Sequence, residues 1–282
     1  MKAKSKRRLI YLAIVAVIAA IFVCGFTFFP ETTKRVIDTF IDTEDLFGYG
    51  ETTNPAGVEK DDADNNTAPG TVNIFADMPE GFDYFAIPEW DGTSAYAIIN
   101  GNIPFFTDEE KETTEIFENY SDLDDLGRCG KAYANICMEL MPEEERGDIS
   151  SVTPSGYKQA KYEGLVDQDY LYNRCHLIAF MLAGENDNPL NLVTGTRYMN
   201  VDGMLPWEKS VQQYIYSNFE CHVLYRVTPI FLNEELVCRG VLMEGYSLED
   251  GGGLQFCVFA YNVQPGIEIS YQNGTPRFRI RP

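Results

Sequence analysis

The residue types found between positions 172 and 208 could together cleave a phosphodiester bond. His176 ends a strand-like run, and Asn200 and Glu208 follow it in the chain. Hydrolysis of a phosphodiester needs a base that deprotonates water and positive charge beside the phosphate oxygens. An imidazole with an ordinary pKa of about 6.5 can take that proton at physiological pH, and carboxamide or carboxylate oxygens bind hard cations such as Mg²⁺. The set therefore predicts metal-assisted phosphodiester hydrolysis.

Each of these residues also has a structural interpretation. A histidine in an apolar run is more often a hydrogen-bonded core residue than a base. Asn191 follows Pro189 and could form a turn, Asn200 could cap a helix, and Glu208 near a helix N-terminus is stabilising whatever its function. The combination favours the chemical interpretation, because the structural one leaves the clustering to chance. The second histidine, His222, has no such company and is interpreted as an ordinary strand residue.

Basic side chains near this set are candidates for contacts with a substrate backbone, because nucleic acids are held mainly through their phosphates. These candidates are Lys158, Lys161, Arg197 and Lys209. Near the C-terminus Arg277, Arg279 and Arg281 alternate, which indicates a phosphate track or, as the more ordinary interpretation, a basic strand edge that discourages pairing. No run mixes aromatic and basic residues in the way that reads bases, which fits sequence-independent cutting.

The N-terminus predicts a membrane anchor that precedes the folded part. Residues 1–8 are a basic tail, and residues 9–29 form an uncharged run whose helix would span about 31 Å at about 1.5 Å per residue, enough to cross a bilayer. Because basic residues favour the cytoplasmic side, everything after Pro30 is expected outside the cell membrane. The alternative is a cleaved signal peptide and a secreted protein, although the run is long for one and lacks a clear cleavage site.

Composition separates a tether from a folded domain. Residues 30–70 are rich in Asp, Glu, Asn, Thr and Gly and predict an acidic flexible linker, so an extracellular domain is expected over residues 71–282. The formal net charge of −21 disfavours long-range attraction of nucleic acid. A polyanionic substrate would need a local cluster of arginine and lysine together with divalent cations, and its binding would be sensitive to salt.

Six cysteines follow the apolar run, and they are Cys129, Cys137, Cys175, Cys221, Cys238 and Cys257. In an oxidising setting they could form up to three disulfides. Buried free thiols that act as small apolar residues are at least as compatible with the sequence. No C-x-x-C pair occurs, so a structural zinc site is not expected.

The folded part has the pattern of an α+β protein with a central, mainly antiparallel sheet flanked by helices. In its first half, residues 95–99 and 103–106 flank a glycine turn and predict a hairpin. Residues 107–110 are typical of a capping box that starts a helix toward Tyr120. Residues 132–141 predict another short helix.

The second half predicts the elements that would position the chemical residues. Residues 156–162 and 170–180 predict two strands, the second of which contains His176. Pro206 in a first turn and apolar residues at helical spacing predict a helix over residues 205–217 that packs one face on the sheet. The predicted strands of the antiparallel centre are residues 221–232, 236–246 and 254–263, and the predicted closing hairpin is residues 267–271 and 276–280.

Three segments carry a family resemblance: Asn173-Arg174-Cys175-His176, the run from Asn191 to Asn200, and Pro206-Trp207-Glu208. They resemble the DNA/RNA non-specific endonucleases with a ββα-metal site, most of all the membrane-attached nucleases of DNA uptake and the streptococcal secreted DNases. The signature of that family runs Asp-Arg-Gly-His, then Asn, then an acidic residue. The resemblance implies a ββα-metal nuclease site within the α+β fold, with DNA as substrate and RNA as a second candidate.

The resemblance also implies roles for single residues. His176 would be the general base, Asn200 the protein ligand of one Mg²⁺, for which Mn²⁺ could substitute, and Glu208 an acid that holds metal-bound waters. Arg174 would steady charge on the phosphate, and Asn191 would orient His176 or its loop. The products would carry 5′-phosphate ends, and nothing indicates an oligomeric state.

Two positions depart from the family signature. Asn173 stands where Asp is usual, and Cys175 stands where Gly is usual. Alternate side chains of a strand share a face, so Arg174 and His176 are expected to face the site while Asn173 and Cys175 face away, which also excludes a Cys175–His176 nucleophile pair. Asn173 and the acidic composition leave a second function open, a surface DNA-binding or uptake component with a weakened catalytic site.

Overall fold

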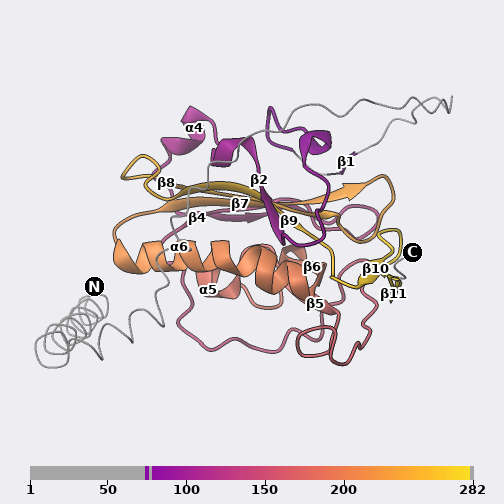
Figure 1. Ribbon diagram of the computed structural model, residues 1–282. Coiled ribbons are helices and arrows are strands. Elements are labelled where there is room, and N and C mark those ends of the chain that lie inside the picture. The colour runs from indigo at the N-terminus through magenta and orange to yellow at the C-terminus, as the bar shows by residue number, and fades with distance from the viewer. Residues whose placement is uncertain (1–73, 76–77, 280–282) are drawn as a thin grey trace, which may run out of the picture. The chain divides into compact units, whose positions relative to one another are not determined.

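The computed structural model describes residues 74–75 and 78–279, and Figure 1 shows the arrangement of their elements. A seven-stranded antiparallel sheet has the order β2-β9-β8-β7-β4-β3, with β1 paired to β7 outside that path. Its strands are β1 (Ile74–Phe75), β2 (Tyr96–Ile98), β3 (Glu118–Tyr120), β4 (Ala132–Ile136), β7 (Val223–Leu232), β8 (Gly240–Ser247) and β9 (Gln255–Tyr261). The fold is α+β, as the sequence pattern predicts.

The central strands β7, β8 and β9 are almost entirely buried, because both faces of the sheet are covered. One face packs against the helix α6 (Leu205–Ser217), whose Val211 and Ile215 belong to the main core. On the other face a smaller cluster forms around Phe259 and Leu242 under residues that precede and follow β2. The predicted antiparallel centre and the predicted helix over residues 205–217 are both confirmed.

A separate two-stranded sheet lies beside α6 (Figure 1) and carries Arg174 and His176. It pairs β5 (Tyr172–His176) with β6 (Leu192–Thr196), so that His176 lies opposite Leu192. Between and after the two strands come α5 (Phe180–Ala183), the turn η3 (Pro189–Asn191) and the π-helix η4 (Met199–Met204), which leads directly into α6. This succession of two antiparallel strands and a helix is the ββα arrangement that the resemblance implies.

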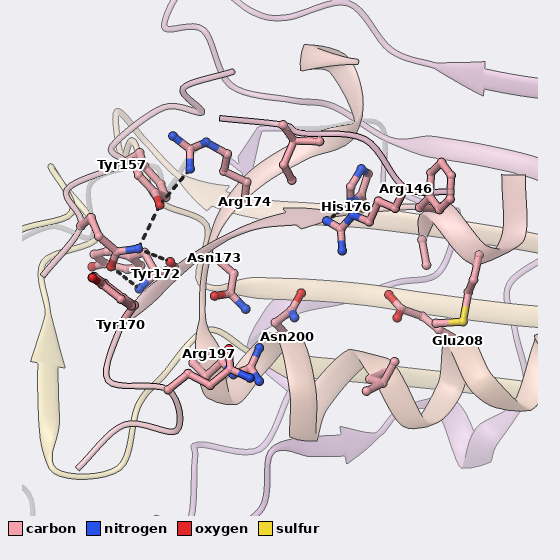
Figure 2. Close-up of a pocket in the computed structure, with 17 residues that line it drawn as sticks. Arg146, Tyr157, Tyr170, Tyr172, Asn173, Arg174, His176, Arg197, Asn200 and Glu208 are labelled. Carbon is pink, nitrogen blue, oxygen red and sulfur yellow. Dashed lines mark hydrogen bonds between the residues drawn. The ribbon is translucent and has the colours of Figure 1, made fainter. Parts of the chain in front are cut away.

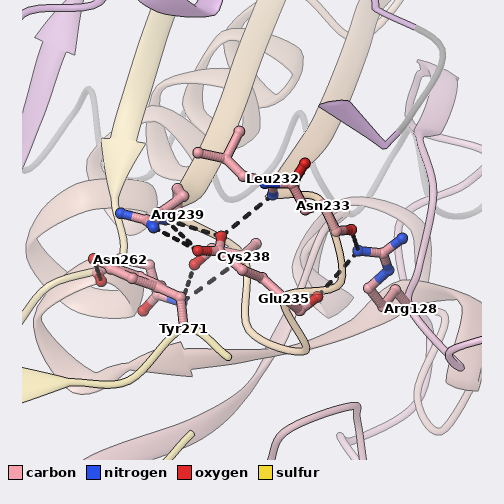
Figure 3. Close-up of polar contacts among 8 residues, drawn as sticks. All are labelled: Arg128, Leu232, Asn233, Glu235, Cys238, Arg239, Asn262 and Tyr271. Atoms are coloured by element: carbon pink, nitrogen blue, oxygen red, sulfur yellow. Dashed lines mark hydrogen bonds and ion pairs between the residues drawn. The ribbon is translucent and has the colours of Figure 1, made fainter. Parts of the chain in front are cut away.

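The side chain of Asn262 joins the β5–β6 sheet to the main sheet, and Figure 3 shows it beside Cys238 and Tyr271. Its Oδ1 accepts a hydrogen bond from the backbone N of Thr196 at 2.9 Å. Its Nδ2 donates to the carbonyl oxygens of Thr194 and Cys238, each at 2.9 Å. Asn262 is completely buried, so these bonds form away from water and fix the hairpin on the sheet.

Three predictions for the first half of the domain are wrong. Residues 103–106 form no strand, because the backbone N of Phe105 bonds the Glu244 carboxylate, and a 3₁₀ turn, η2 (Asn100–Asn102), follows β2. The capping box at Thr107 is present, but its helix α4 (Asp108–Lys111) has a single turn and the chain then enters β3. Residues 132–136 form the strand β4, since pairing on both sides with β3 and β7 outweighs the helix propensity of two alanines.

Predictions for the loop around the hairpins are partly confirmed. Within residues 156–180 the strand is β5 alone, and the preceding segment reaches it only through a bridge between Lys161 and Tyr170. The closing hairpin exists as β10 (Ile267–Ile269) and β11 (Pro276–Phe278), which pair with each other rather than with the main sheet. A remaining short 3₁₀ turn, η1 (Tyr84–Ala86), precedes β2.

The six cysteines in the described part of the chain are all free, and five of them are buried, in agreement with the apolar-thiol interpretation. Cys175 packs over Gly195 on the paired strand, where a β-carbon would come within 2.3 Å of the Cys175 sulfur. Cys175, which stands where the family usually has glycine, fits because residue 195 is a glycine and has no side chain.

The predicted tail, anchor and linker, residues 1–8, 9–29 and 30–70, lie outside the described residues, as do Arg281 and the start of the predicted domain at Thr71. Across residues 78–279, no helix has the length and apolar character needed to cross a membrane.

Candidate active site

A cavity of about 550 Å³ lies between the β5–β6 sheet and the start of α6. It is lined by β5, by the loop of residues 146–159 that precedes it, by η4 and by the first turn of α6. His176, Asn200 and Glu208 all line this cavity, and Figure 2 shows the three side chains directed toward a common space. Three residues that the sequence singled out therefore line one cavity.

His176 is held by hydrogen bonds at both ring nitrogens. Its Nε2 lies 2.7 Å from the carbonyl oxygen of Asn186, and its Nδ1 lies 3.3 Å from Nη2 of Arg146. A carbonyl can only accept and a guanidinium can only donate, so Nε2 carries the proton and Nδ1 presents a lone pair. That lone pair accepts the hydrogen bond from Arg146.

The imidazole of His176 is neutral under physiological conditions. Burial lowers the pKa of His176 to about 4, and the charge of Arg146 acts in the same direction. Only 6% of the residue is exposed. A base that is already unprotonated at neutral pH is ready to accept a proton, although a low pKa also limits its strength as a base.

Arg146 is a site residue that the sequence reasoning missed. Its guanidinium contacts His176, and its charge also reaches the buried carboxyl of Glu208, whose pKa it lowers. It follows three glutamates, Glu143 to Glu145, so it resembles an ordinary surface turn. The signal that could have found it is that Arg146 is the only basic residue between positions 132 and 157.

Arg174 lines the cavity, but its guanidinium turns away from His176 toward the preceding loop (Figure 2). Its Nε donates to the carbonyl of Val152 at 2.5 Å and its Nη2 to that of Ser150 at 3.2 Å. Its Nη1 lies 3.3 Å from the hydroxyl of Tyr157. In this arrangement Arg174 holds the loop, and Arg146 is the guanidinium placed beside the base.

Asn200 and Glu208 form the part of the cavity that could receive a cation. Glu208 is only 7% exposed and burial raises its pKa to about 8, against the opposing charge of Arg146. Neither side chain has a hydrogen-bond partner among residues 78–279. A buried carboxyl and a carboxamide without partners are suited to a cation that brings its own water, because Mg²⁺ usually takes one or two protein oxygens and keeps several waters.

This pair would be the whole protein contribution to a metal site. Within the part of the chain that the structure describes, no three side chains of histidine, cysteine, aspartate or glutamate gather as metal ligands. A zinc site of the usual four-ligand kind is therefore absent from residues 78–279, and the donor set fits a hydrated hard cation.

Asn191 does not reach the cavity, although it lies close to His176 along the paired strands. It is completely buried, and its side chain holds both polar groups of Ile178: Oδ1 accepts from the Ile178 N at 2.8 Å and Nδ2 donates to the Ile178 O at 2.9 Å. The residue fixes the turn that follows His176, in keeping with an orienting role.

Of the four basic residues expected at the substrate, only Arg197 lines the cavity, where it pairs with Asp167 at 2.7 Å. Lys158 donates to Thr275 and Lys161 pairs with Glu163, both outside the cavity lining, and Lys209 is exposed on α6 away from it. These three lysines do not line the cavity, contrary to the prediction. Residues that are close to the site along the sequence can lie away from it in space, because the chain turns between residue 156 and β5.

The prediction that Asn173 faces away is also wrong, since Asn173 lines the cavity together with its neighbour Arg174. The cavity extends around the strand, so both strand faces contribute to it. Cys175 does point away, into the core. Of the two residues that differ from the family signature, Asn173 therefore faces the cavity and Cys175 faces the core.

Comparison with known proteins gives a family match and a fold match. Residues 108–248 match a family model described as DNA/RNA non-specific endonuclease. The chain is similar to NucA from Streptococcus agalactiae with magnesium bound, with a TM-score of 0.58 and 24% identity over 64% of this chain and 86% of that one. The metal-free form of NucA gives a TM-score of 0.56 and 23% identity over the same shares. The Sda1 nuclease with bound zinc is 29% identical over 56% of this chain and 80% of that one, with a TM-score of 0.48.

Proposed function

The chain belongs to the DNA/RNA non-specific endonuclease family, and we propose that it is a Mg²⁺-dependent, sequence-non-specific endonuclease that hydrolyses phosphodiester bonds of DNA, with RNA as a second substrate. The observation that carries the proposal is the convergence of His176, Arg146, Asn200 and Glu208 on one cavity. These four side chains supply a base, a fixed positive charge and two oxygen donors.

In the proposed mechanism Nδ1 of His176 takes a proton from the attacking water. The carbonyl of Asn186 holds the opposite ring nitrogen and so keeps the ring in the tautomer that can do this. Arg146 would leave His176 for a phosphate oxygen when substrate binds, because a guanidinium pairs strongly with phosphate. That exchange would free the lone pair of Nδ1 at the moment when it is needed.

Asn200 would hold Mg²⁺ through its carboxamide oxygen, and Glu208 would orient the waters around the ion. When bound, Mg²⁺ would supply positive charge to the phosphate and to the departing oxygen. Asn191 would act indirectly, by fixing the turn that sets the position of His176.

Local charge supports a polyanionic substrate even though the chain is acidic. Three arginines line the cavity, Arg146, Arg174 and Arg197, and Glu208 is the one acidic side chain in its lining. Arg197 also pairs with Asp167 outside the lining, and burial raises the pKa of Glu208. The formal net charge of −21 belongs to the whole chain. Attraction would therefore be short in range and strongly weakened by salt.

Location outside the cell membrane is the remaining part of the proposal. It is supported by the basic tail and the uncharged run of residues 9–29 in the sequence, which favour a single-pass anchor with the catalytic domain outside. Release after cleavage of that segment is the alternative.

The test is plasmid cleavage by the full-length protein with Mg²⁺, comparing the parent with His176→Ala. Loss of the base should slow cleavage by about 10²–10⁴-fold. His222→Ala is the matched control, because His222 is the other histidine and pairs with Glu249 rather than lining the cavity. Equal rates for the parent and His176→Ala would refute the proposal.

A second function, a surface DNA-binding component with a weakened site, is favoured by one observation, the amide of Asn173 in the cavity where the family usually has a carboxylate. Binding of plasmid without cleavage by the parent, together with cleavage by Asn173→Asp, would support it. Cleavage by the parent at a rate that His176→Ala abolishes would exclude it.

A further inference from the structure

The end of the cavity farthest from Glu208 has an aromatic wall that the proposed chemistry does not use. It is formed by Tyr157 and Tyr170, with the amide side chains of Gln159 and Gln168 beside them. Figure 2 shows Tyr157 and Tyr170 at the opposite end of the cavity from His176, with Asn173 and Asn200 between. Tyr170 is 52% exposed and lines the cavity. Its ring therefore presents an apolar face to the cavity and to solvent.

The Tyr157 side of the wall is fixed before any substrate arrives. The guanidinium of Arg174 lies over the ring at 4.5 Å from its centroid. Nε2 of Gln159 donates to the Tyr157 hydroxyl at 3.0 Å and to the carbonyl of Tyr172 at 2.5 Å. A neighbouring tyrosine serves the fold instead: Tyr172 is 1% exposed and its hydroxyl donates to the carbonyl of Gly274.

A turn with unfavourable backbone angles brings Tyr170 to the cavity rim. Gln168 and Asp169 have φ angles of 60° and 68°, in the left-handed region that residues with side chains rarely adopt. The turn is held by the Asp169 N, which donates to the Val166 carbonyl at 2.8 Å, and by the Asp169 carboxylate, which accepts from the Gly164 N at 3.1 Å. Two such residues in succession next to a cavity are characteristic of binding segments.

We propose that this wall is a subsite for an unpaired nucleobase, which stacks on Tyr170 while the adjoining phosphates pass Arg174 and Arg197 toward His176. The proposal rests on the proposed nuclease function and names its preferred substrate class, single-stranded nucleic acid. A base within a duplex is stacked and paired, so it cannot turn into the wall without being extruded. Every base has a π-face, so stacking is tolerant of sequence and agrees with non-specific cutting.

The wall combines aromatic and basic side chains, a pattern that is not visible along the sequence. Tyr157 and Tyr170 come from two turns of one loop, and Arg174 comes from the strand that follows it. They meet because the chain reverses at residues 162–169 and runs back beside itself, with Lys161 bridged to Tyr170.

The first experiment compares cleavage of a single-stranded oligothymidylate with cleavage of a hairpin duplex, using the full-length protein with Mg²⁺. Tyr170→Ala should lower kcat/KM for the single strand about 5- to 150-fold, which is the measured range for loss of one stacked base, and should change the duplex rate less than twofold. Tyr170→Trp should retain the single-strand rate. The matched control is Tyr216→Ala, since Tyr216 is a 40% exposed tyrosine on α6 outside the cavity lining.

Equal losses on both substrates, or no loss on the single strand, would overturn the subsite. A second measurement separates it from the nuclease proposal. An oligothymidylate with one 2-aminopurine should lose fluorescence on stacking when it is mixed with the parent or with His176→Ala in EDTA, but not with Tyr170→Ala. If His176→Ala cuts like the parent, the nuclease proposal fails, and this quench alone then decides for or against the base subsite.

Discussion

Lowering the pH should reduce the free energy of unfolding of the metal-free protein, because His176 is protonated more readily in the unfolded chain. A substitution of His176 should remove this part of the pH dependence. The pKa of this imidazole falls from 6.5 to about 4 on folding, mainly because the ring is buried. A folded-state pKa below the unfolded one means that the unfolded chain binds the proton more readily, so the stability is present above pH 6.5 and is lost as pH falls toward 4. At about 1.4 kcal/mol per pKa unit, this difference amounts to about 3 kcal/mol.

The perturbation is His176→Gln, whose side-chain amide can still donate to the carbonyl of Asn186 but does not titrate. Urea unfolding in EDTA would be measured for parent and variant at a series of pH values from 7.5 to 4. The parent should lose about 3 kcal/mol more than His176→Gln across that range. Carboxylates common to both proteins cancel in the comparison, so a difference that stays constant with pH would refute the reasoning.

Three further predictions concern other site residues. Asn191→Ala should lower the free energy of unfolding by about 2–4 kcal/mol, as measured in urea, because both polar groups of Ile178 lose a buried partner. Glu208→Gln should raise the stability of the metal-free protein at pH 8.5 by up to about 5 kcal/mol, because a pKa raised to about 8 means that stability is lost as pH rises from 4.5 toward 8; a variant no more stable than the parent in thermal unfolding would contradict this. In plasmid cleavage, Lys158→Gln should change kcat/KM less than twofold and Arg197→Gln severalfold, since only Arg197 lines the cavity.

The long helix and the long strands were predictable because each has a clear hydrophobic pattern in the sequence. The helix α6 has Pro206 in its first turn and apolar residues at helical spacing, and β7 to β9 are long, mostly apolar segments bounded by turns. The strand β4 was not predictable in the same way, since Ala132 and Ala134 are compatible with a helix and only the pairing with β3 and β7 decides.

The cavity residues could be named from the sequence where they lie in segments that resemble the family, and not where a loop must fold back. His176, Asn200 and Glu208 belong to β5, η4 and α6 and were identified from the sequence. Arg146 reaches His176 from a loop thirty residues earlier in the chain. Lys158 and Lys161 were expected at the cavity and do not line it. They lie in the loop before β5, and its path in space could not be read from their distance along the sequence.

Thr196 is the last residue of β6, and its backbone N–H donates to the buried side chain of Asn262, the residue that follows β9 and that Figure 3 shows beside Cys238. Exchange of this proton with deuterium from the solvent therefore requires the hairpin to part from β8 and β9, not merely to fray. The same side-chain amide also holds the carbonyl of Cys238 before β8. The hairpin that carries His176 should therefore open as one cooperative unit with the sheet, and a rise in temperature that frees the hairpin should also release the core.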